Sequence, residues 1–270
     1  AGHAERASAQ AFQASIINSS GTVNRNITSG TTETITIGSD SAIIDWLPND
    51  DFSIPFLFLP AGHTATFQNG LTNADFVVLN RIVSGVPQRF DGTVLGRLQD
   101  AGGNPLGPGG TILFASPGGI IVGPNAVFDV GNLVLTTLNV VSDANFNFVT
   151  PTGGFRFDGG ENAPNAAVVV EPGARILATA QNSYVALVAP RVEHRGTIDV
   201  NGSAAFIAGE QLEFSVNQGL FDINIAVGSD NPQPISGAAT SPRKVARPAA
   251  STTMLSPASA SPSVTSCAAV

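Results

Sequence analysis

The sequence predicts an all-β chain coiled into a right-handed parallel β-helix, with short capping strands and surface-loop excursions. Between residues 109 and 137, apolar strands of three to five residues alternate with turns of Ser, Pro, Gly and Asn. These turn residues accept positive φ or fix φ near about −65°, so the chain changes direction every few residues and leaves no length for helices. Strand-turn-strand units also recur later in the chain, spaced by roughly 20 residues, the scale of one solenoid repeat.

The composition indicates a folded chain with an acidic body. Hydrophobic residues make up 43% of the 270 residues, enough for a sizeable core, whereas charged residues are 12%, about half the usual share. All twenty acids lie at or before Asp230 together with nine arginines, which gives this part a net charge of −11. Such a surface, without basic clusters, argues against nucleic acid or an anionic membrane as a partner. The single cysteine, Cys267, excludes an internal disulfide, and no apolar run approaches the length of a membrane helix.

The first third of the chain is predicted to form strands and one segment that caps an end of the solenoid. Alternating β-branched residues over residues 15–37 predict strands, and Trp46 follows as an expected core anchor. Residues 50–62 are rich in Phe and Pro and are expected to form a loop or cap over an open end of the solenoid, where unpaired edges need a cover. Residues 74–83 form the next predicted strand.

The remaining two thirds contain two excursions and a clear repeat. Residues 93–110 and 139–157 are expected to leave the solenoid as surface loops. Three successive strand-turn-strand units follow, over residues 167–178, 184–200 and 204–216. Ile176 and Ile198 occupy equivalent places 22 residues apart, which predicts that they stack in adjacent coils. We expect about ten coils over residues 15–230.

Three segments follow from these patterns. Residues 1–14 are an N-terminal segment that is expected to follow a removed signal peptide, because they lack the basic region and apolar stretch of an intact one. Ala7-Ser8-Ala9 has the small-residue pattern of a cleavage site, within an Ala-rich stretch. Residues 15–230 form the β-helical domain. Residues 231–270 contain Pro, Ser, Ala and Thr without acids, together with a small basic group, and predict a disordered tail.

Four segments resemble those of a known family, in the same order over about residues 30–228. Ile44-Asp45-Trp46 resembles the family's early Ile-Asp-Trp, and residues 78–83 resemble its Val-Leu-Asn-Arg-Val strand. The family's Asn-Pro-Asn-Gly-Ile turn corresponds to Ser116-Pro117-Gly118-Gly119-Ile120, and residues 184–187 match its Tyr-Val-Ala-Leu coil. On these residues the chain resembles the N-terminal secretion domain of filamentous haemagglutinin-like two-partner-secretion exoproteins.

The resemblance implies which residues of this chain a transporter recognises. Both Asn residues of the family's turn are replaced here, by Ser116 and Gly118, but Ser can bond to the backbone and Gly accepts the left-handed region. We therefore expect the turn to persist, with positive φ at both of its glycines. The residues expected to carry recognition are Asn80, Arg81, Ser116, Pro117, Gly118, Gly119 and Ile120.

The function implied by the resemblance is that of a secretion and folding-nucleation module of a large bacterial exoprotein, such as an adhesin. The domain would be recognised, unfolded, by the periplasmic part of a dedicated outer-membrane transporter. It would then fold outside the cell, on the surface or secreted, where glycans or proteins of a host cell are possible ligands of the exoprotein. No enzyme activity, catalytic residue, metal or cofactor is expected.

Two other functions stay open on the sequence. One is a β-helical carbohydrate-active enzyme, which would need a cleft with two carboxylates roughly 5–9.5 Å apart. The acids Asp50, Asp51, Asp91, Asp158 and Glu161 lie in expected loops, where we interpret them as solvated turn acids, and His3, His63 and His194 lack metal-ligand spacing. The other is a stand-alone adhesin, which an exposed aromatic patch over residues 50–59 or 145–157 would favour.

Overall fold

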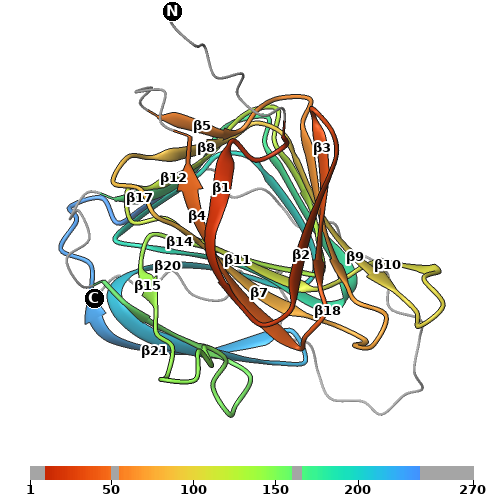
Figure 1. The fold of residues 1–270 in the computed structure, drawn as a ribbon. Coiled ribbons are helices and arrows are strands. Elements are labelled where there is room, and N and C mark those ends of the chain that lie inside the picture. Colours follow the sequence, from red (N-terminus) through yellow and green to blue (C-terminus); the bar gives the residue numbers. More distant parts are fainter. Residues whose placement is uncertain (1–9, 50–54, 160–165, 238–270) are drawn as a thin grey trace, which may run out of the picture.

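The computed structural model describes residues 10–49, 55–159 and 166–237, which form β-strands and turns wound into a parallel β-helix around a three-sided lumen (Figure 1). Strands stack in parallel on each side. Face 1 contains β4 (Ser41–Pro48), β7 (Val77–Ile82), β11 (Thr111–Ala115) and β14 (Asn132–Thr136). Face 2 contains β5 (Phe56–Leu59), β8 (Gln88–Phe90), β12 (Ile120–Val122), β17 (Ala167–Val170), β19 (Arg191–His194) and β22 (Ile235–Gly237).

Face 3 contains β3 (Thr32–Ile37), β6 (Thr64–Asn69), β9 (Thr93–Gln99) and β13 (Val127–Asp129). Two long strands, β18 (Arg175–Ala189) and β20 (Thr197–Asn217), bend around a corner: each begins on face 3 and continues on face 1. Within them Ile176 is the register partner of Ile198, which confirms the predicted 22-residue repeat. Parallel pairing of equivalent positions therefore builds the solenoid.

The lumen is filled by alternate residues of every face, because successive side chains of a strand point to opposite sides. Its centre is a row of aromatic rings whose neighbouring centroids lie 4.9–6.3 Å apart, formed by Phe12, Trp46, Phe58, Phe67, Phe90, Phe114 and Phe128. Trp46 is fully buried, which confirms its expected role as a core anchor.

Two expectations about loops and the expected number of coils are wrong. Residues 56–59, expected in a cap, form β5 at the edge of face 2, and Phe58 is fully buried; residues 50–54 lie outside the described part. Residues 93–99 form β9 within face 3, so that excursion is confined to residues 100–110 with β10 (Pro105–Pro108). Face 2 has six strands, so the described coils are far fewer than ten. There are fewer coils than expected because many residues lie in loops and in strands outside the coils.

The second excursion builds a layer over the outside of face 1 (Figure 1). There β15 (Asn139–Val140), β16 (Phe155–Asp158), the end of β20 and β21 (Leu220–Gly228) form an antiparallel sheet. It covers outward residues of face 1 that are apolar, among them Leu79, Leu113 and Val134. The third predicted repeat, residues 204–216, is therefore only half correct: β20 stacks on β18 as far as Ala208 and then leaves the coil to pair with β21.

The N-terminal end is closed by capping strands, as expected, and by one further segment. Here β1 (Ala14–Ser20) pairs antiparallel with β4, and β2 (Val23–Ser29) pairs antiparallel with β3. Residues 10–14, here called the plug, lie in the core: Ala11, Phe12 and Ala14 have no exposed surface. The plug belongs to the segment that the sequence analysis sets outside the domain, and β22 likewise lies beyond residue 230. Among the described residues no helix is long and apolar enough to cross a membrane.

Candidate functional site

The predicted recognition residues of β7 are divided between the lumen and the outside. Asn80 points inward and is fully buried, although the lumen is otherwise apolar here. The Trp46 indole N–H donates to Asn80 Oδ1 at 3.0 Å, and Asn80 Nδ2 donates to the carbonyl of Leu113 at 3.0 Å. The Asn80 amide thus links β4, β7 and β11, and it satisfies a Trp donor that burial would otherwise leave without an acceptor.

Arg81 points outward and is held by one carboxylate. Arg81 Nε lies 2.6 Å from Asp45 Oδ1, and Nη2 lies 3.0 Å from Asp45 Oδ2, a bidentate pair. Asp45 also accepts a hydrogen bond from Asn18 of β1 at 3.2 Å. Asp45 and Arg81 are register partners in β4 and β7. Two segments that carry the family resemblance therefore contact each other: Trp46 with Asn80, and Asp45 with Arg81.

The turn at residues 116–119 connects β11 to β12. Its closing hydrogen bond runs from the Gly119 N–H to the Ser116 carbonyl at 3.0 Å, and Ser116 N–H donates to Thr136 of the next coil. Pro117 occupies the second turn position, where a fixed φ favours the turn. Ser116 is fully buried, and its hydroxyl oxygen has no hydrogen-bond partner. Ser116 therefore holds the turn through its backbone rather than through its side chain.

The two glycines of this turn are required for different reasons. Gly119 has φ of +120°, the left-handed region expected for it. Gly118 does not have positive φ, so that expectation is wrong; instead a Cβ atom there would lie 2.5 Å from the carbonyl of Val86 in the coil below. Gly118 thus permits close stacking of two turns, a requirement of tertiary contact that the local sequence does not reveal.

The structure brings both predicted segments together on consecutive coils. Arg81 is the register partner of Ala115, directly before the turn, and Gln88 N–H donates to the Gly119 carbonyl at 3.0 Å. In the folded domain, however, little of this site faces water. Asn80, Ser116, Gly119 and Ile120 are buried, whereas Pro117 is exposed and Gly118 and Arg81 are partly exposed.

The other candidate residues serve structural contacts. Asp91 Oδ2 lies 2.7 Å from Arg89 Nε, and the same guanidinium binds both oxygens of Glu171 two coils away. His63 Nδ1 lies 3.3 Å from the Ala11 carbonyl, and His194 stacks on Phe206 with ring centroids 5.2 Å apart. Burial lowers the pKa of His194. Within the described ranges no group of three or more His, Cys, Asp or Glu could hold a metal; His3, Asp50, Asp51, Glu161 and Cys267 lie outside them.

Sequence reasoning missed two features of the molecule. The plug was missed because Ala and Gln gave no periodic signal, although Glu33, at a lumen-facing position of an alternating strand, could have indicated a buried partner. A groove of about 430 Å³ between face 1 and the outer sheet was also missed. Its lining includes Val77, Thr111, Phe155, Asn182, Tyr184 and Gln218. It arises from the antiparallel excursion, whose position the sequence did not predict.

Comparisons with known proteins agree with this architecture. The family model of the TPS secretion domain matches residues 12–264. The crystal structure of the HMW1 secretion domain from Haemophilus influenzae is similar with a TM-score of 0.57 at 20% identity, over 83% of this chain and 50% of that one. The chain therefore spans about half the length of that relative. The crystal structure of a filamentous hemagglutinin secretion domain is similar with a TM-score of 0.52 at 16% identity, over 82% of this chain and 73% of that one.

A search of curated proteins finds no match. The two structural likenesses concern the fold, whereas the family model covers most of the chain. The β-helix, its capping strands and the segments in common order lead to the same assignment. The chain belongs to the TPS secretion domain family, the secretion module of two-partner secretion.

Proposed function

We propose that this domain is recognised by its outer-membrane transporter as an unfolded chain, and that folding buries most of the recognition residues. Burial of the predicted site is the observation that carries this proposal. Asn80 has no exposed surface and uses its amide to bind Trp46 and Leu113, so a partner could reach it only before the coils stack. Ser116, Gly119 and Ile120 are buried in the same way.

The chemistry of the chain fits passage through a pore before folding. Cys267 is the only cysteine, so no internal disulfide can form and hold part of the chain folded. Once outside, a solenoid adds coils one at a time, each on the edge of the last. The domain would then begin the folding of a longer exoprotein outside the cell, on its surface or released. A host ligand of that exoprotein is part of this proposal and rests on the family alone.

The geometry favours this role over a carbohydrate-active enzyme. The lining of the described groove contains no carboxylate, and Asp91 and Glu171 share Arg89 in an ion-pair network rather than facing a cleft. A hydrogen bond to Glu171 raises the pKa of Arg89 well above its ordinary value, so this cation stays charged. We therefore propose that the domain is not an enzyme.

A direct adhesive role through the Phe-rich excursions is also less well supported. Of the phenylalanines in residues 145–157, Phe148, Phe155 and Phe157 are buried between the outer sheet and face 1, and Phe146 is about half exposed. Phe56 and Phe58 are buried in face 2. A lone exposed aromatic ring on this excursion is not the contiguous patch that would mark a ligand-binding surface.

The test uses matched substitutions in urea-denatured chain that is diluted and captured by the periplasmic domains of the transporter. Asn80→Ala is compared with Asn69→Ala, another fully buried asparagine, which hydrogen-bonds Gln99. Arg81→Ala is compared with Arg97→Ala, which removes a similar ion pair, with Asp129. We expect capture to fall with the first of each pair only. Equal capture of both members of each pair would contradict these recognition residues.

A further inference from the structure

The plug closes the N-terminal end of the lumen with a single aromatic side chain. The ring of Phe12 has its centroid 5.2 Å from that of Trp46 on face 1, 4.9 Å from Phe58 on face 2 and 6.1 Å from Phe67 on face 3. It also lies 6.0 Å from Phe114 of β11, two coils further in than Trp46 and Phe58. Phe12 therefore contacts all three faces at once and shields the first rings of the aromatic row from water.

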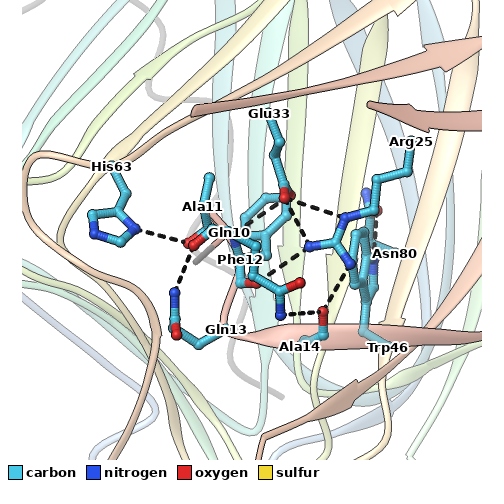
Figure 2. A network of polar contacts seen from close by, with 10 residues as sticks. All are labelled: Gln10, Ala11, Phe12, Gln13, Ala14, Arg25, Glu33, Trp46, His63 and Asn80. Carbon is cyan, nitrogen blue, oxygen red and sulfur yellow. Dashed lines mark hydrogen bonds and ion pairs between the residues drawn. The ribbon is translucent and has the colours of Figure 1, made fainter. Parts of the chain in front are cut away.

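A charged pair lies beside this ring, inside the solenoid. Glu33 lies on the lumen-facing side of β3, the same side as Ile35 and Ile37. Its side chain has no exposed surface. Arg25 of β2 reaches it, with Nη2 at 2.7 Å and Nε at 3.2 Å from Glu33 Oε2 (Figure 2). A buried carboxylate is stable only when its oxygens are paired and hydrogen-bonded.

The main chain of the plug completes this pair. The Phe12 N–H donates to Glu33 Oε1 at 3.4 Å, and the guanidinium of Arg25 donates to the carbonyls of Phe12 at 3.3 Å and Ala14 at 2.9 Å (Figure 2). The same guanidinium lies over the ring of Trp46, 4.9 Å from its centroid. Without the plug, Glu33 Oε1 and part of the guanidinium would have no protein partner at the open end of an aromatic core.

Further backbone bonds fix the plug between faces. Gln13 N–H donates to the Phe58 carbonyl of β5 at 2.8 Å, and Asn49 N–H donates to the Gln13 carbonyl at 2.9 Å. His63, which precedes β6, lies 3.3 Å from the Ala11 carbonyl. Residues 11–14 thus meet donors or acceptors from several segments of the solenoid, and the Gln10 side chain bonds Ala14 within the plug. They occupy the end of the solenoid as a bound peptide would occupy a groove.

We propose that the N-terminal end of the solenoid is a built binding site for residues 10–14 and that its occupancy gates folding. The first coil is covered on one side by the second coil, and on the other by the plug together with β1 and β2. Until the plug enters, this coil leaves aromatic surface and a half-satisfied ion pair in water. The plug therefore completes the coil on which the others stack. The site takes a bent peptide segment with one aromatic side chain and main-chain carbonyls that accept from Arg25.

This gate gives a partner a simple means of control. Any molecule that holds residues 10–14 keeps the first coil open, and its release starts folding. The consequence for secretion rests on the proposed function, because it requires a partner that handles the unfolded chain. The gate itself does not, since it concerns only contacts within the domain.

Refolding kinetics of the full chain test the gate. Trp46 is the only tryptophan and lies against Phe12, so its emission reports entry of the plug, while far-UV circular dichroism reports strand formation. Phe12→Ala is compared with Phe128→Ala, an equally buried ring at the far end of the same aromatic row. We expect Phe12→Ala to slow folding by roughly tenfold or more in both signals, whereas Phe128→Ala mainly speeds unfolding.

The opposite pattern overturns the gate. If Phe12→Ala regains its strand signal at the parental rate while Trp46 stays accessible to a quencher, the plug is a lid that docks last. If Phe12→Ala does not fold at all, Arg25→Lys is compared with Arg97→Lys; lysine keeps the charge but cannot span both plug carbonyls. Slower folding of the first alone then supports the gate, and equal rates contradict it. None of these measurements involves a transporter, so their failure leaves the proposed recognition standing.

Discussion

At the scale of single residues, Asn80 shows how a polar group becomes part of an apolar lumen. Its amide accepts from Trp46 and donates to Leu113, so burial leaves neither of these partners unsatisfied. The sequence analysis singled out Asn80 through the family resemblance and Trp46 as an expected core residue, without relating the two. Their contact depends on parallel stacking of β4 and β7 in one register, which only the fold supplies.

Replacing this amide should destabilise the domain. Asn80→Leu leaves the Trp46 N–H buried without an acceptor and removes the side-chain hydrogen bond to the Leu113 carbonyl, which should lower the free energy of unfolding by roughly 1–3 kcal/mol. Urea unfolding followed by Trp46 emission measures the loss. Asn24→Leu on the exposed side of β2 is the control and should change little. An unchanged midpoint for Asn80→Leu would show that the two hydrogen bonds contribute nothing to stability.

Gly118 illustrates a residue requirement imposed by the neighbouring coil. A methyl group at Gly118 would meet the Val86 carbonyl at 2.5 Å, so Gly118→Ala should cost roughly 1–3 kcal/mol of stability through overpacking. Gly85 lies in the turn below, with open space around its Cβ position and no positive φ, so Gly85→Ala should be neutral or slightly stabilising. Denaturant midpoints compare the two. Equal midpoints would show that the turns do not stack as described.

At the scale of elements, the accuracy of the sequence prediction depended on whether an element repeats. The 22-residue spacing placed Ile176 beside Ile198 correctly because each coil buries the same inward positions. The turn at residues 116–119 was also predicted, since Pro and Gly specify turns locally. The outer sheet and the plug were not, because their partners are distant in the sequence: Phe155 pairs with Phe214, and Phe12 packs edge-to-face against Phe114.

The packing of His194 of β19 against Phe206 of β20 predicts that the stability of the domain depends on pH. Burial lowers the pKa of His194 below its ordinary value of 6.5, so the folded state keeps this ring neutral where the unfolded chain binds a proton. Its contribution to stability is therefore complete above about pH 6.5 and is lost as the pH falls through the lowered pKa. His194→Gln should reduce the loss of unfolding free energy on going from pH 7 to 5, measured by urea titration. His63→Gln is the control. If the unfolding free energy of His194→Gln depends on pH as that of the parent does, His194 does not cause the loss.

At the scale of the whole molecule, folding and recognition exclude each other. The three faces enclose one aromatic row from Phe12 to Phe128, and closing this row buries Asn80 in the lumen and Ser116 at the adjoining turn. Residues that identify the chain to a partner before folding therefore become structural residues after it. The resemblance could suggest these positions, but only the stacked coils show that Asn80, Ser116, Gly119 and Ile120 are buried in the folded domain.

The most direct measurement compares two states of one chain against the periplasmic domains of the transporter. The full chain is applied once freshly diluted from urea and once after complete refolding, with Trp46 emission recording the state at the time of binding. We predict capture of the freshly diluted chain that declines as Trp46 becomes shielded, and at least about tenfold weaker binding of the refolded chain. Equal binding of the refolded chain would contradict the account, because it would place recognition on the exposed surface of the folded domain.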